Sequence, residues 1–153
     1  MSEFEKSSQN FDLTAPCGIC CGVCEFNMAK DEPKLLQYFA LKGIDTSHLP
    51  CDGCRQIKCD CISINGICKT FTCVKEHDID FCYECNDFPC EKLQPSFDRA
   101  DVLPHNMKVF NICVIRNQGL NEFVEKVNEN KQKYYKGKME IGNGPHIEVT
   151  QES

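Results

Sequence analysis

The chain has 153 residues, 41% of them hydrophobic, which is enough for one domain with a modest core. Its formal net charge of −6 argues against nucleic-acid binding, because an acidic protein repels the phosphate backbone. No segment approaches the roughly 20 apolar residues of a membrane span, and the polar N-terminus lacks the apolar run of a signal peptide. We therefore expect a cytoplasmic protein with no membrane contact, whose thiols are kept reduced.

Thirteen of the fourteen cysteines lie between Cys17 and Cys90. Such a density indicates either a disulfide scaffold or a set of thiolate metal sites, and a reducing compartment favours the metal sites. Several cysteines are separated by two residues, as in Cys51-Asp-Gly-Cys54, a spacing that lets both sulfurs face one ion. The sequence therefore predicts metal binding.

In the first 66 residues the sequence predicts one helix between two segments with little regular structure. Residues 1–14 are polar, and we expect a mobile arm there. The acidic turn with a proline at 31–33, followed by apolar residues at helical spacing, predicts a helix that ends at Gly43. The stretch 46–66 is rich in turn residues and should contain few helices or strands.

Two short helices are expected in the middle of the chain. Residues 69–77 predict a helix that carries Cys73 and His77 four residues apart, hence on one face. We do not favour His77 as a ligand, because a histidine near a helix end is more often solvated. A second helix should begin near Cys90, where the helix dipole would favour the thiolate.

The last part of the chain predicts a helical hairpin over 104–130 and a flexible tail over 131–153. We expect a first helix over about 104–117, with Cys113 as a small buried hydrophobe, and a second helix after Gly119. The expected apolar faces carry Leu103, Met107, Phe110 and Val114 in the first helix, and Leu120, Phe123, Val124 and Val127 in the second.

These elements predict a small cysteine-rich α domain. An irregular layer of metal knuckles with short helices, over 17–93, is followed by a packed C-terminal helical hairpin, and both belong to one domain over 15–130. A layer of this kind needs its metal in order to fold, because structural zinc contributes roughly 10–16 kcal/mol of apparent binding energy.

The chain contains four cysteine motifs: Cys17-Gly-x-x-Cys21-Gly-x-Cys24, Cys51-x-Gly-Cys54-Arg55, Cys68-x4-Cys73 and Cys82-x-Glu-Cys85-x-Asp-Phe-Pro-Cys90-Glu-Lys-Leu. Together with a helix–glycine–helix junction at 115–123, they resemble the bacterial and archaeal domain of unknown function 3795 family. The resemblance covers about residues 15–130. It implies metal binding without implying a reaction.

Carried over position by position, the resemblance implies ten metal ligands. Cys20, Cys59 and Cys61 stand outside the pattern and look additional, although Cys59, Cys61 or His77 could complete a third site. Ten thiolates fill two four-cysteine sites with two sulfurs over, and the pairing of distant knuckles stays open. The implied ligands are Cys17, Cys21, Cys24, Cys51, Cys54, Cys68, Cys73, Cys82, Cys85 and Cys90.

Zinc is the expected metal, and an iron–sulfur cluster is the alternative, because thiolates bind both. The cysteines Cys17, Cys21 and Cys24 also have the spacing of radical S-adenosylmethionine enzymes, but the chain is too short for the barrel of those enzymes.

With zinc, closed four-thiolate coordination leaves no position for chemistry, so we expect a non-catalytic module that binds an unidentified protein partner. With iron, the protein would act in electron transfer or cluster-dependent catalysis. A thiol oxidoreductase that cycles Cys82 and Cys85 is a third alternative, and it lacks the usual βαβ context. No Ser/His/Asp set or carboxylate pair stands out in the sequence.

Overall fold

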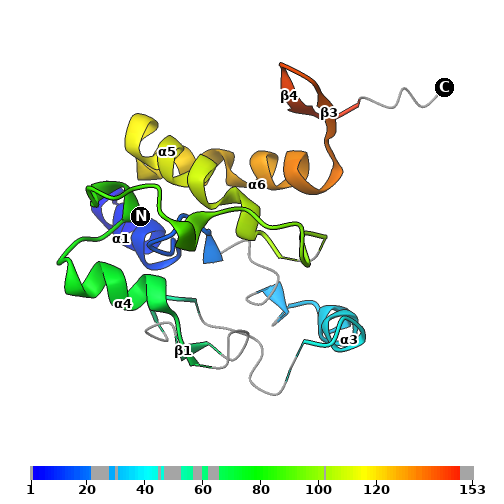
Figure 1. The fold of residues 1–153 in the computed structure, drawn as a ribbon, viewed down its shortest axis with the longest axis horizontal. Coiled ribbons are helices and arrows are strands. Elements are labelled where there is room, and N and C mark those ends of the chain that lie inside the picture. The colour runs from blue at the N-terminus through cyan, green and yellow to red at the C-terminus, as the bar shows by residue number, and fades with distance from the viewer. Residues whose placement is uncertain are drawn as a thin grey trace.

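The computed structural model in Figure 1 describes residues 2–21, 28–29, 31–44, 46, 53–56, 60–61, 66–101 and 103–148. Two long helices, α5 and α6, lie across one side of the molecule, and the cysteine-bearing segments lie beneath them. The fold is that of a small, mostly helical domain, as the sequence predicts. None of the described helices is long and apolar enough to cross a membrane.

The helical hairpin consists of α5 (Lys108–Gln118) and α6 (Leu120–Lys136), joined at Gly119. Gly119 has φ +93°, a left-handed conformation that favours glycine and reverses the chain sharply. Phe123 and Val127 of α6 pack against Ile112 and Ile115 of α5 in one cluster of the core. The predicted hairpin is therefore present, with the predicted residues of the second helix inside it.

The buried face of α5 differs from the prediction. Phe110, which was expected in the core, is 60% exposed, and Cys113 and Val114 are only half-buried. The buried residues are instead Asn111, Ile112 and Ile115. The prediction is wrong here because α5 has apolar residues on nearly all sides, so its pattern does not define one face.

The N-terminus is helical where we expected a mobile arm. Helix α1 (Glu3–Asp12) begins with a capping box, in which Ser2 and Glu5 satisfy each other's backbone N–H groups. It packs on α6: Lys6 forms an ion pair with Glu125 at 3.0 Å, and Asn10 donates to Asn121 at 2.8 Å. The polar side chains of this segment are thus contacts to α6.

The cysteine-bearing layer contains α3 (Lys34–Leu41), α4 (Lys69–Glu76) and the antiparallel strands β1 (Asp60–Cys61) and β2 (Gly66–Ile67). Helices α3 and α4 match the two helices predicted there. The helix expected near Cys90 is a single 3₁₀ turn, η4 (Glu91–Leu93), preceded by another, η3 (Cys82–Glu84). A third 3₁₀ turn, η5 (His105–Met107), leads into α5.

The segment before α5 connects α3 with α6. Lys42, at the end of α3, forms an ion pair with Asp101 at 2.7 Å. The hydroxyl of Tyr134 in α6 donates to the carbonyl oxygen of Ala100 at 3.2 Å. Burial raises the pKa of Tyr134, which keeps the hydroxyl protonated as the donor.

The last described segment also differs from the expected flexible tail. Residues 131–136 extend α6, and the strands β3 (Lys138–Glu140) and β4 (Gly144–His146) form an antiparallel hairpin. Figure 1 shows this hairpin beyond the end of α6.

Candidate metal centre

The first cysteine motif is a tight turn pressed against α5. The N–H of Ala15 donates to the carbonyl of Ile19 at 2.8 Å, and Thr14 forms an isolated bridge with Cys20. Gly18, at φ +94°, lies so close to α5 that a Cβ there would be 2.8 Å from Cγ1 of Ile112. The side-chain amide of Asn111 donates to the Gly18 carbonyl at 2.9 Å. Only glycine fits this contact.

Arg55, which follows Cys54, ties three segments of the site together. Its Nε donates to the carbonyl of Thr14 at 2.7 Å, and its Nη2 donates to the carbonyl of Asp80 at 2.8 Å. Its guanidinium carbon lies 3.9 Å from the ring centroid of Phe11 and 5.0 Å from that of Phe81. The sequence contained this arginine within a motif but gave no sign of its role.

Cys21 and Cys54 are brought together from separate motifs. The N–H of Cys54 donates to Sγ of Cys21 at 3.3 Å. A hydrogen bond with the Cys54 side chain, followed by burial, raises the pKa of the Cys21 thiol well above its ordinary value. Cys24 and Cys51, the other predicted ligands of these two motifs, lie outside the described residues.

Cys82 lies beside the first motif. Its N–H donates to the carbonyl of Pro16 at 3.0 Å. One carboxylate oxygen of Glu84 accepts from the N–H groups of both Asp80 and Phe81 at 2.8 Å, which holds the start of η3 in place. The chain is therefore fixed on both sides of this thiol.

Burial raises the pKa of the Cys82 thiol to about 12, and neighbouring thiols add to the shift. In order of effect, the neighbours are Cys17, Cys90, Cys73 and Cys85. Burial also raises the pKa of Cys17, although the ammonium of Lys108 partly opposes that shift. These thiols are therefore close enough to repel one another once they are ionised.

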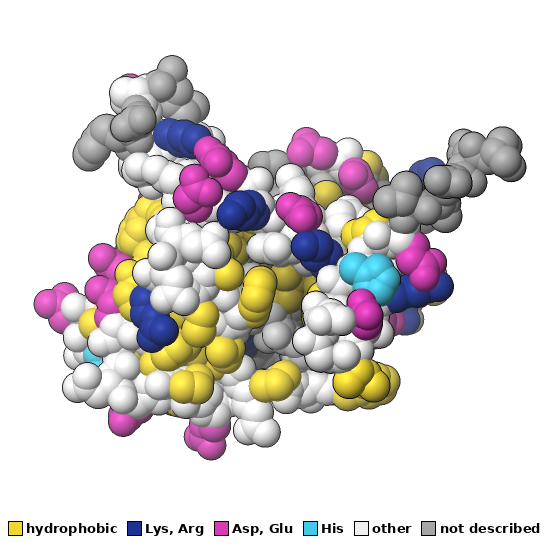
Figure 2. Space-filling model, turned by 90° about the horizontal axis from the view of Figure 1, so that it is seen from above, with side chains coloured by type: hydrophobic (Ala, Val, Ile, Leu, Met, Phe, Trp, Pro, Cys, Tyr) yellow, Lys and Arg dark blue, Asp and Glu magenta, His cyan; other side chains and the backbone are white. Residues whose placement is uncertain are grey.

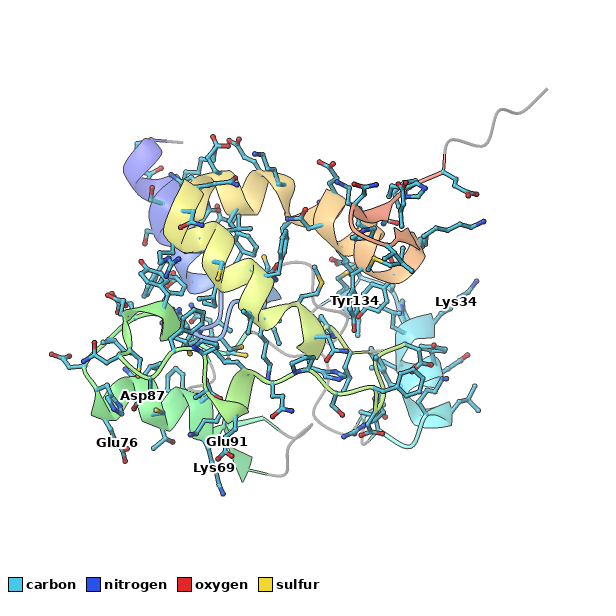
Figure 3. The ribbon with its side chains drawn as sticks, turned by 45° about the horizontal axis from the view of Figure 1, so that its top comes forward. Lys34, Lys69, Glu76, Asp87, Glu91 and Tyr134 are labelled. Atoms are coloured by element: carbon cyan, nitrogen blue, oxygen red, sulfur yellow. The ribbon has the colours of Figure 1, made fainter. Side chains whose placement is uncertain are left out.

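Four of them, Cys73 from α4 and Cys82, Cys85 and Cys90 from the segment 82–90, line one cavity. Its walls are completed by apolar residues that include Val74, Phe88 and Leu93, and by Thr70, Asp87 and Lys92, whose polar groups do not face into the cavity. Figure 3 shows Lys69 and Glu76 at the two ends of α4, with Asp87 and Glu91 on the same side of the molecule. The cavity is rich in sulfur, apolar inside and mixed in charge outside.

The side chains around this cavity do not converge as they stand. Among the described residues, no three Cys, His, Asp or Glu side chains form a group arranged to hold a metal ion. Cys68, although predicted as a ligand, is half-buried before α4 and does not line the cavity. Cys59 lies outside the described residues, and of Cys61 only its place in β1 is described.

His77 and Cys20, which the sequence analysis also considered, lie outside this cavity. Nδ1 of His77 lies 2.8 Å from the carbonyl oxygen of Cys73 and 3.7 Å from its sulfur, and His77 does not line the cavity. Cys20, which stood outside the motif pattern, is buried with Phe81 and Ile112 in the main core.

Comparison with known proteins gives one match. No curated protein and no solved structure matches the chain. The model of the family described as "Protein of unknown function (DUF3795)" matches residues 13–95, more than half of the chain, from the turn before Cys17 to just beyond η4. The chain therefore belongs to the family of proteins of unknown function DUF3795.

Proposed function

We propose that this protein is a non-catalytic metal-binding module, and that Cys73, Cys82, Cys85 and Cys90 hold one zinc ion in closed tetrahedral coordination. The single observation that carries the proposal is that these four cysteines, from α4 and from the segment after it, line the same cavity. Four thiolates are a common ligand set for structural zinc.

The surroundings of the thiols fit a cation. Ionised sulfurs this close together repel one another, and a divalent ion would convert that repulsion into attraction. The apolar walls would exclude water and strengthen the metal–sulfur interaction. Binding would require the side chains to rotate inward, because they do not form a ready metal group as they stand.

The pair Cys21 and Cys54 supports a second centre. The hydrogen bond between them brings two motifs together, and each motif has another cysteine three residues away in sequence, Cys24 and Cys51. A four-thiolate set from these two motifs would give a protein with two zinc ions. Cys17, whose ionised thiol would repel those of Cys21 and Cys82, belongs to neither four-thiolate set.

Closed coordination would leave the metal without a position for water, so its role would be to hold the cysteine layer in the shape that a protein partner recognises. The alternative is an iron–sulfur cluster on the same thiols, which would make the protein an electron carrier or a cluster-dependent enzyme. We infer a cytoplasmic location from the same requirement for reduced thiols.

The test is metal analysis of protein that is purified without oxygen. We expect colourless protein that contains zinc, and loss of zinc from a Cys82→Ser variant but not from Cys113→Ser, which changes a half-buried thiol outside the cavity. Brown protein with iron and sulfide would support the cluster instead. Protein that binds neither metal after reconstitution would overturn both.

A further inference from the structure

The β3–β4 hairpin is apolar on one side and polar on the other. Side chains alternate between the faces of a strand, so Met139 and Pro145, which are paired in register, share a face, and Ile141 and Ile147 follow two residues later, just beyond the ends of the two strands. Met139 is 69% exposed, Ile141 97% and Ile147 44%. The opposite face carries Lys138, Glu140 and His146, and Lys138 forms an ion pair with Glu148, just beyond β4.

A two-stranded hairpin with an exposed apolar face is marginally stable in water, and it needs further strands or a packing surface. Among the described residues, the only strand paired with β3 is β4, and the hairpin lies past the end of α6 (Figure 1). Figure 2 looks onto this side of the molecule and shows hydrophobic side chains exposed among charged ones. The hairpin thus has an edge and a face available to a partner.

The two edges of the hairpin are not equivalent. Pro145 lies in the middle of β4 and has no N–H to donate, so it weakens that edge as a template for another strand. Every residue of β3 retains its N–H. Strand addition is therefore favoured at the edge of β3.

The sequence of β3 is complementary to itself when two copies pair in antiparallel fashion. If two β3 strands pair with Met139 opposite Met139, Lys138 of each copy faces Glu140 of the other. A shift that places Glu140 opposite Glu140 would set like charges together, so the charges select the register centred on Met139. Glu140 makes no ion pair with any described residue of its own chain, and Lys138 pairs with Glu148 at 3.0 Å.

We propose that the partner of this edge is a second copy of the chain, and that two β3 strands join the hairpins into a four-stranded antiparallel sheet with two-fold symmetry. The two Met139 side chains lie opposite each other on the apolar face, with Ile141 of each copy beside them. The dimer does not depend on whether the cysteines bind a metal, so it can fail or succeed independently of that proposal.

The test is the oligomeric state of the full chain, measured by sedimentation equilibrium from micromolar to millimolar concentration. We expect a concentration-dependent dimer whose dissociation constant rises about tenfold in Lys138→Glu or in Glu140→Lys, since each change replaces two attractive cross-strand pairs with two repulsive ones. The double variant Lys138→Glu with Glu140→Lys restores the attraction and returns the dissociation constant to near its original value.

A matched control is Glu148→Lys, which breaks the pair with Lys138 inside one chain and leaves the proposed pairs between chains intact. Its dissociation constant should stay within about twofold of the original. A monomer at every concentration overturns the proposal. So does a dimer that is insensitive to Glu140→Lys, or one that the double variant fails to restore, since each of these places the interface elsewhere.

Discussion

The guanidinium carbon of Arg55 lies 3.9 Å from the ring centroid of Phe11, so the arginine that follows Cys54 stacks on the last turn of α1. The same group donates to the carbonyls of Thr14 and Asp80, which precede Cys17 and Cys82. The planar guanidinium can stack on an aromatic ring and donate hydrogen bonds to two carbonyls at the same time, which the ammonium of a lysine cannot do. The relative position of three cysteine motifs therefore depends on one side chain that is not a cysteine.

Arg55→Lys should lower the free energy of unfolding by about 1–3 kcal/mol, because the ammonium can replace at most one of the two charged hydrogen bonds and loses the stacking. Denaturant unfolding of the purified chain measures this change. The control is Arg116→Lys, since Arg116 is exposed and its side chain bonds only to the neighbouring Asn117 among the described residues. Equal effects of the two changes would mean that Arg55 does not hold the layer together.

Phe123→Ala should lower the free energy of unfolding by about 3–5 kcal/mol, because the ring is fully buried between α5 and α6 and its removal leaves a cavity. Phe110→Ala, on the exposed side of α5, should cost less than about 1 kcal/mol. The measurement is the denaturant midpoint of both variants. A large loss at Phe110 would indicate that its side chain is covered in solution.

The contrast between these two phenylalanines explains how far the helical hairpin could be predicted. In α6, the apolar residues at 120, 123, 124 and 127 lie on one side of the helix and the charged residues on the other. Both the helix and its buried face can therefore be predicted from the spacing of the apolar residues. In α5, apolar residues occur on most sides, and the buried face is decided by the turn at Gly18, which accepts a bond from Asn111. Asn111 is buried because it donates to the carbonyl of Gly18, which is distant in sequence, and a contact of this kind does not appear in the hydrophobic periodicity of the helix.

In the candidate site, too, the local features could be predicted from the sequence and the contacts between distant segments could not. Short spacings such as Cys82 to Cys85 are local, so the sequence alone predicts that these two thiols lie near each other, as they do along the cavity. The approach of Cys54 to Cys21 and of Cys73 to Cys82 depends on how α4 and the first turn pack, so spacing contains no information on it. The sequence predicts a mobile arm at the polar N-terminus for a related reason, because the residues of α6 that α1 contacts lie more than a hundred positions away in the sequence.

Gly18→Ala should be more damaging than the same change at Gly43. Both glycines have positive φ, +94° and +79°, so alanine is strained at either position by about 1–2 kcal/mol. A Cβ at Gly43 meets nothing within 4 Å, whereas at Gly18 it would lie 2.9 Å from the backbone oxygen of Lys108, which cannot move without shifting α5. The loss of melting temperature in Gly43→Ala measures the backbone strain alone, and the additional loss in Gly18→Ala measures the steric clash with α5. Equal losses would show that α5 does not press on the first turn.

Serine variants should separate cysteines that bind metal from cysteines that only pack in the core. Cys82→Ser and Cys85→Ser should remove metal and stability together, because both thiols line the cavity and zinc binding contributes folding free energy. Cys20→Ser should lower stability without changing metal content, since Cys20 is buried against Phe81 and Ile112 and a hydroxyl there is poorly accommodated.

Chelation extends the same comparison to the whole chain. Removing the metal should raise hydrogen exchange cooperatively over 17–93, while α5 and α6 keep more of their protection through the core around Phe123. Zinc addition should restore the original pattern. If the chelated protein keeps its protection throughout, the metal does not hold the cysteine-bearing layer in its shape. If Cys20→Ser also loses metal, the separation of ligand thiols from core thiols is wrong.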